Sequence, residues 1–126
     1  MPTTRSLALA LATASIALVP ATALAKSGDV VVRGSCTKAS TSKLKLRLDN
    51  SRIQTEFEVD QNRNGVVWNV TLVRNGVRAV STTAMTQAPS GSFTVRRLLT
   101  NGAGTDTITA RATSPSGEIC TAKASI

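Results

Sequence analysis

The chain has 126 residues, with 15 Lys and Arg against 7 Asp and Glu, no His, no Tyr, two Cys and a formal net charge of +8. This length accommodates one small domain. The absence of His excludes imidazole metal sites and catalysis by Ser/His/Asp or Cys/His sets, because each of these needs an imidazole.

Residues 1–25 have the layout of a secretory signal peptide. Arg5 is followed by an uncharged apolar run over residues 7–19 and then by the small-residue sequence Ala23-Leu24-Ala25. The run is shorter than the roughly 20 residues that a membrane-spanning helix needs. We therefore predict cleavage between Ala25 and Lys26, no transmembrane segment, and a secreted domain of residues 26–126 that is free or associated with the cell wall.

The two cysteines, Cys36 and Cys120, lie near opposite ends of this domain. Export would place them in an oxidising compartment, where such pairs form disulfides. Two free thiols and a metal site are the alternatives, and two cysteines without histidine make a poor zinc site. We predict the disulfide, and we expect no metal and no other cofactor.

Residues 26–126 show no helical period, and apolar and polar residues alternate in segments bounded by turn residues. This pattern predicts an all-β fold, a two-layer antiparallel β-sandwich of about seven or eight strands. Asn75-Gly76 predicts a two-residue hairpin turn, because both central positions of a type I′ turn need positive φ. The expected strands are 29–37, 42–49, 52–60, 66–74, 77–85, 92–100, 106–113 and 118–124.

One hairpin register is predicted in detail. If Asn50-Ser51 is the loop, Lys45 faces Glu56 and Lys43 faces Glu58, while the apolar residues of both strands share the opposite face. A register one residue off would turn one apolar row outward. The outward carboxylates Glu56, Glu58 and Asp60 could suggest acid–base chemistry, but the pairing favours a salt ladder.

A second catalytic spacing also has a structural interpretation. Ser-x-x-Lys occurs at residues 35–38 and 40–43, as in serine–lysine acyl transfer, but that chemistry places the serine at the start of a helix. Both stretches are expected in strand and loop. We therefore expect a protein that is not an enzyme.

Three stretches carry a resemblance to known domains: Trp68–Leu72 with the Asn75-Gly76 turn, Ser90–Val95, and Gly104–Ala112. They resemble the middle and late strands of bacterial immunoglobulin-like or fibronectin type III-like domains, over residues 53–124, and the whole chain resembles small secreted bacterial proteins made of one such domain. The resemblance implies an Ig-like sandwich with a binding, adhesion or spacing role and no catalytic residues. The chain departs from the family because it has no Tyr for a tyrosine corner, and because its Cys pair would join the first and last strands.

The net charge of residues 26–126, +7, favours anionic partners. The aromatic residues Phe57, Trp68 and Phe93 are all expected to face inward, so they offer no stacking platform and we expect no specific nucleic-acid binding. We expect a monomer whose partner is a protein or an anionic cell-wall polymer. A basic charge that serves only solubility is the alternative.

Strand directions predict where the loops lie. The loops at 37–42, 61–65, 86–91 and 114–117 should share one end, with 50–51, 75–76 and 101–105 at the other. Longer loops make the better binding surface, so Lys38, Arg63, Gln87 and Ser90 are the candidate binding residues. The alternative function is a secreted protease inhibitor that presents residues 86–91.

Overall fold

The computed structural model describes Ser15, Lys26 and residues 28–126. Of the predicted signal peptide, residues 1–25, only Ser15 is among the described residues. Ala25, the residue before the predicted cleavage point, therefore lies outside them. In the part of the chain that is described, no helix is both long and apolar enough to cross a membrane.

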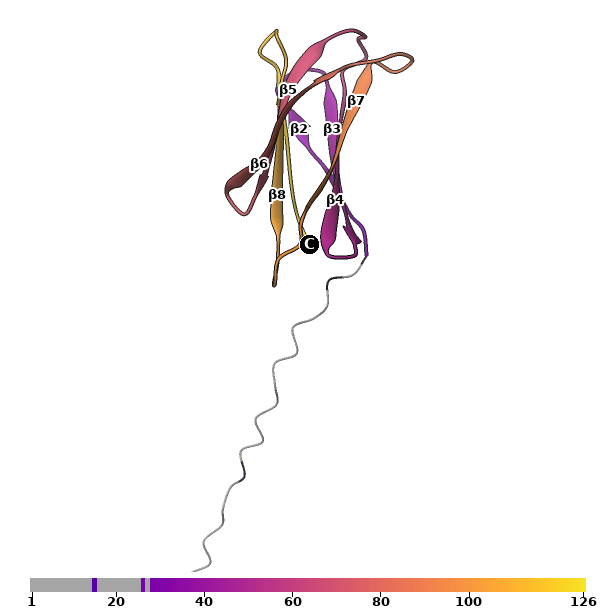
Figure 1. The fold of residues 1–126 in the computed structure, drawn as a ribbon. Coiled ribbons are helices and arrows are strands. Elements are labelled where there is room, and N and C mark those ends of the chain that lie inside the picture. Colours follow the sequence, from indigo (N-terminus) through magenta and orange to yellow (C-terminus); the bar gives the residue numbers. More distant parts are fainter. Residues whose placement is uncertain (1–14, 16–25, 27) are drawn as a thin grey trace, which may run out of the picture.

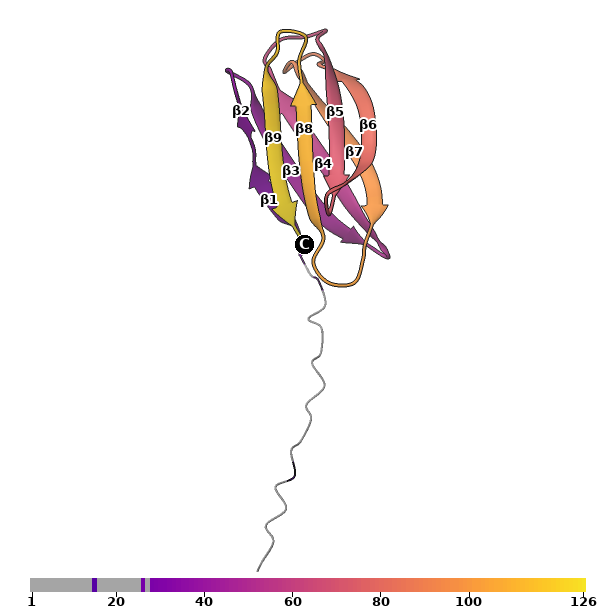
Figure 2. The ribbon, with the colours of Figure 1, turned by 90° about the vertical axis from the view of Figure 1, so that its left-hand side faces the viewer.

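The described chain is all-β, as predicted, and its strands form two antiparallel sheets packed face to face (Figures 1 and 2). One sheet has four strands in the order β1-β3-β4-β7, and the other has five in the order β2-β9-β8-β5-β6. The strands are β1 (Val30–Arg33), β2 (Ser35–Cys36), β3 (Thr41–Asp49), β4 (Arg52–Asp60), β5 (Val67–Arg74), β6 (Val77–Met85), β7 (Ser92–Thr100), β8 (Thr107–Thr113) and β9 (Ile119–Ser125).

The first expected strand is divided between the two sheets, which corrects the sequence prediction and brings the described residues to nine strands. β1 pairs with β3 in one sheet, and after Gly34 the chain continues as β2, which pairs with β9 in the other. A Cβ atom at Gly34 would collide with Ser42 Oγ and the carbonyl oxygen of Thr121. Glycine is therefore required where the chain passes closely between the sheets.

The β3–β4 hairpin has the predicted register. Lys45 lies opposite Glu56 and Lys43 opposite Glu58, and the apolar residues of both strands face the core. The predicted ladder needs one correction, because Lys45 forms its ion pair with Asp29, at 3.5 Å, and Glu56 accepts a hydrogen bond from Arg96 of β7. β4 lies between β3 and β7, so Glu56 has a cationic residue opposite it on each side, Lys45 and Arg96.

The core lies between the sheets and contains all three aromatic side chains, as predicted. Trp68 and Phe57 are fully buried, and the rings of Trp68 and Phe93 lie 6.0 Å apart between centroids. The indole nitrogen of Trp68 donates to Gln61 Oε1, so the one polar atom of this ring is satisfied at the edge of the core. No aromatic ring of the described residues is exposed, so the described surface offers no ring on which a base or a sugar could stack.

The loops divide between the two ends as predicted. Asn75 and Gly76 both have positive φ, 49° and 81°, in the tight β5–β6 turn. This turn lies at the same end as the β3–β4 turn and the chain's C-terminus, opposite the longer loops (Figure 1).

Candidate functional site

The four longer loops meet at one end of the sandwich, which we call the long-loop end: residues 37–40, 61–66, 86–91 and 114–118. The amide of Gln61 donates to the carbonyl of Gly91, and that of Gly65 donates to Thr86. Lys38 Nζ donates to the carbonyl of Ser116. These bonds join the loops in two pairs, 61–66 with 86–91 and 37–40 with 114–118.

The predicted binding residues are all exposed at this end. Arg63 lines a shallow open depression between the two loop pairs, together with Gln61, Pro115 and Ser116. Gln87 and Ser90 lie on the turn before β7, and Lys38 is bound to Ser116. The structure therefore brings the four residues to one end, but only Arg63 lines this depression.

Residues 86–91 form a braced, projecting turn. The amide of Gly91 donates to the carbonyl of Gln87 at 2.8 Å, and the hydroxyls of Ser90 and Ser92 lie 2.6 Å apart. Thr86 is buried, whereas residues 87–90 are exposed. A Cβ atom at Gly91 would collide with the backbone of residues 62 and 63, so the base of the turn packs directly on the neighbouring loop.

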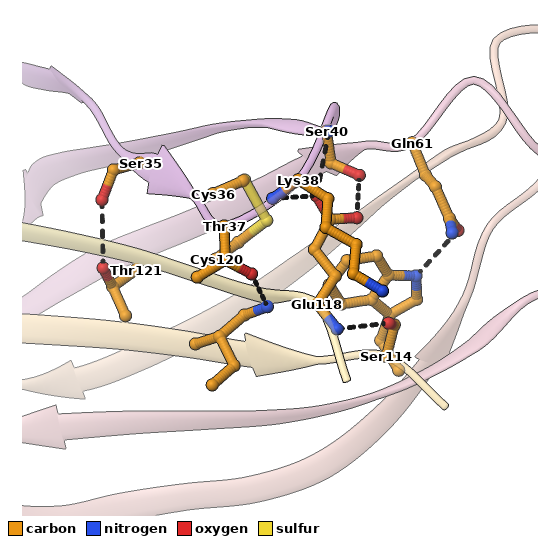
Figure 3. The surroundings of a disulfide bond; sticks show 12 residues. Ser35, Cys36, Thr37, Lys38, Ser40, Gln61, Ser114, Glu118, Cys120 and Thr121 are labelled. Atoms are coloured by element: carbon orange, nitrogen blue, oxygen red, sulfur yellow. Dashed lines mark hydrogen bonds between the residues drawn. A yellow bond between two sulfur atoms is a disulfide. The ribbon is translucent and has the colours of Figure 1, made fainter. Parts of the chain in front are cut away.

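The predicted disulfide is present and borders the long-loop end (Figure 3). Cys36 and Cys120 are direct cross-strand partners on β2 and β9, and the bond closes a sequence separation of 84. Glu118 lies within 4.8 Å of both sulfurs and could suggest a metal ligand set. The sulfurs are bonded to each other, so they are not thiolates that a metal could bind.

The sequence analysis did not predict the structural role of Glu118. Its side chain is buried and accepts hydrogen bonds from the amides of Lys38 and Ser40 and from the Ser40 hydroxyl, the last at 2.6 Å (Figure 3). The carboxylate thus organises the loop between β2 and β3. Its signal was present in the sequence, because Glu118 continues the inward row of β9 that includes Cys120.

The carboxylates and serines whose spacing could suggest catalysis have structural partners within the fold. Glu58 Oε1 lies 3.9 Å from Lys43 Nζ, and Asp60 accepts a hydrogen bond from the Asn62 amide. Ser35 contacts Thr121, and the Ser40 hydroxyl donates to Glu118. Each group thus contributes to a sheet face or a loop.

The opposite end contains a second buried acid, Asp106, that the sequence interpretation did not single out. Its carboxylate, 1% exposed, lies 2.6 Å from Lys26 Nζ and 2.7 Å from Arg74 Nη2. It also accepts hydrogen bonds from the Asn75 side chain and the Gly102 amide. Asp106 therefore links Lys26, the β5–β6 hairpin and the loop before β8.

Burial raises the pKa of Asp106, but the hydrogen bonds from Lys26, Gly102 and Asn75 and the charge of Lys26 outweigh that effect. Together they lower the pKa from 3.8 to about 2. The carboxylate is therefore ionised throughout the physiological range. It stabilises this end without being available to a ligand.

The remaining acids are all associated with the four-stranded sheet. Asp29 contacts Lys45 of this sheet, and the others lie on its two central strands: Asp49, Glu56, Glu58 and Asp60. The chain has seven acids, and the other two are the buried Asp106 and Glu118. The outer face of the five-stranded sheet therefore has no acid, whereas it carries Arg78, Arg111 and Lys123.

Comparison with known proteins finds no family model, no curated protein and no solved structure that matches the chain. The fold and its geometry define a disulfide-bonded, all-β, two-sheet sandwich.

Proposed function

We propose that the protein is a secreted, noncatalytic binding module that associates with anionic polymers of the cell envelope. The observation that carries the proposal is that the exposed acids are confined to the four-stranded sheet. The exposed acids accompany the four-stranded sheet, and two acids are buried, so the cations of the five-stranded sheet have no acid on their own face. An uncompensated cationic face attracts polyanions and orients them toward that side of the molecule.

Other features support the same function. The disulfide suits an oxidising compartment, and the two-sheet architecture is the one that the resemblance to bacterial immunoglobulin-like or fibronectin type III-like domains implies. Binding roles are common among such sandwiches, although the architecture by itself specifies no ligand.

The test starts from the whole chain, expressed with its own N-terminus and recovered from the culture medium. N-terminal sequencing should begin at Lys26. The purified protein should be retained on immobilised polyglycerol phosphate at low salt, released at high salt, and not retained on neutral dextran, because salt screens exposed charge. Recovery only inside the cell, or equal behaviour on both matrices, would contradict the proposal.

A second function, protease inhibition by residues 86–91, is favoured by the bracing of that turn. Pre-organised loops bind with a smaller entropy cost than mobile ones, and the exposed residues 87–90 are fixed by bonds at both ends. An inhibitor should slow a panel of secreted serine proteases at stoichiometric concentration. Cleavage of the turn without inhibition would exclude this alternative.

A further inference from the structure

The outer face of the five-stranded sheet is rich in hydroxyl groups. Antiparallel registers align its outward residues in rows, and one row contains Thr71, Arg111, Thr121 and Ser35 on β5, β8, β9 and β2. The neighbouring row contains Val73, Thr109 and Lys123. The face thus combines cations with closely spaced hydrogen-bonding hydroxyls on a regular strand lattice.

The cations of this face are placed as neighbours. Arg111 lies opposite Thr121, and Lys123 is two residues further along β9, so Arg111 and Lys123 are diagonal neighbours with Cα atoms about 7–8 Å apart. Both side chains are exposed, and neither forms an ion pair with any acid of the described chain. Their charges are therefore available to an external anion.

A hollow lies beside this pair because β2 has only two residues. Past Thr121 no strand of the described chain pairs with the outer edge of β9, and a groove opens between β9 and β1. We call it the β9 notch. Its lining includes Arg33, Ser35, Thr109, Thr121 and Lys123.

Arg33 contributes a second reason for an anion at the notch. It lies directly opposite Lys43 on β3, and cross-strand pairs of like charge are destabilising. Lys43 has Glu58 as its partner, at 3.9 Å, whereas Arg33 forms no ion pair within the described residues. Arg33 and Lys123 both line the notch, so a phosphate bound there would reduce this repulsion and compensate cationic charge.

We infer that the β9 notch and the adjoining face around Arg111 bind a linear polymer of phosphodiester-linked polyol units. Arg33, Lys123 and Arg111 contact successive phosphates, and Ser35, Thr109 and Thr121 hydrogen-bond with phosphate oxygens or polyol hydroxyls. Exposed aromatic rings, which single-stranded nucleic acids use for stacking, are missing from the described surface. The inference rests on the proposed function and names its surface and ligand class.

The experiment compares two triple variants of the exported, full-length gene product, each lacking three cations. The notch variant is Arg33→Gln/Arg111→Gln/Lys123→Gln, and the matched control is Arg47→Gln/Arg52→Gln/Arg97→Gln. All six side chains are exposed, and the fluorescence of the buried Trp68 checks that each variant folds.

The probe is polyglycerol phosphate. We expect the notch variant to lose affinity by at least about tenfold, because charged hydrogen bonds are lost. Its slope of log Kd against log salt should decrease by about one for each phosphate contact removed. The affinity of the control variant and its salt dependence should stay close to those of the wild type.

The possible results separate the two proposals. Equal loss in both variants would mean attraction by net charge alone, which overturns the notch and leaves the proposed function standing. No binding by the wild type would overturn both. Equally strong competition by single-stranded DNA would overturn the polyol assignment.

A second variant tests the hydroxyl groups without changing charge. Ser35→Ala/Thr121→Ala should weaken binding to polyglycerol phosphate by about threefold, with a smaller effect on inorganic polyphosphate, which has no hydroxyls along its chain. The same loss on both polymers would contradict recognition of the polyol.

Discussion

Asp106 and Glu56 show how differently the acids of this chain contribute. Asp106 is buried and receives two cations and two further hydrogen bonds, whereas Glu56 lies on a sheet face beside Arg96. Ion pairs on a surface contribute at most about 1 kcal/mol, because water and salt screen them. Removing one partner of a buried pair costs much more, because the remaining charges lose their compensation.

The substitution Asp106→Asn should therefore destabilise the protein by about 3 kcal/mol near neutral pH. The pKa of Asp106 is about 2 in the folded protein against an ordinary value of 3.8. The stabilisation from ionised Asp106 is thus fully present above pH 3.8 and is lost as the pH falls toward 2. Urea unfolding of both proteins, followed by Trp68 fluorescence, should show a stability difference that shrinks across this window.

The control is Asp49→Asn, which changes an exposed acid at the end of β3. Its stability should stay within about 0.5 kcal/mol of the wild type. A difference between wild type and Asp106→Asn that stayed constant over the acid range would show that the charge of Asp106 is not what stabilises this end.

Among the elements, the divided first strand is where the sequence prediction was wrong. Val30, Val32 and Cys36 form a continuous inward row, so the period of two is unbroken across Gly34. An inward row can be buried in either sheet of a sandwich, because both sheets face the same core. Periodicity therefore predicts the strand but not the sheet it joins.

Gly34→Ala should destabilise the protein by about 2 kcal/mol or more, because the added methyl group has no space. One of the atoms it would meet is the backbone carbonyl of Thr121, which cannot rotate away as a side chain can. Urea unfolding measures the effect, and the neighbouring exposed Ser35→Ala is the control. Wild-type stability in Gly34→Ala would show that the crossover tolerates a side chain.

The β3–β4 hairpin was predictable because its determinants are local. A two-residue loop sets the register, and the apolar rows and opposite charges then agree with it. The partner of each charge was less predictable. Lys45 contacts Asp29 and Glu56 contacts Arg96, because the neighbouring segments and β7 also reach this face.

For the whole molecule, the disulfide is the principal covalent constraint in the described chain. It closes a separation of 84 residues, which in the chain-entropy model stabilises the fold by about 4.5 kcal/mol. Reduction, or the double substitution Cys36→Ala/Cys120→Ala, should lower the urea midpoint accordingly. Reductant should not affect the double variant, and an unchanged midpoint in fully reduced wild type would contradict the prediction.

The sequence by itself determined the all-β class, most strand positions, the hairpin turns, the cysteine pair and the two groups of loops. The strands and turns follow from the alternation of apolar and polar residues and from the turn residues, which act over short distances. The two groups of loops follow from the strand order, because successive strands run in opposite directions. Even the buried acids left a signal, because Asp106 and Glu118 each extend an inward row by one position. The structural role of the two acids could not be predicted from that row, because their partners Lys26 and Ser40 lie far away in the sequence.

Only the tertiary structure decided which strands share a sheet, and therefore which charges share a face. The total of +8 is the same for every arrangement of the strands. Packing β2, β9, β8, β5 and β6 together placed Arg111 and Lys123 on a face without acids, and the short β2 opened the notch beside them. Such a surface combines residues far apart in the chain, so it depends on long-range packing that no local pattern specifies.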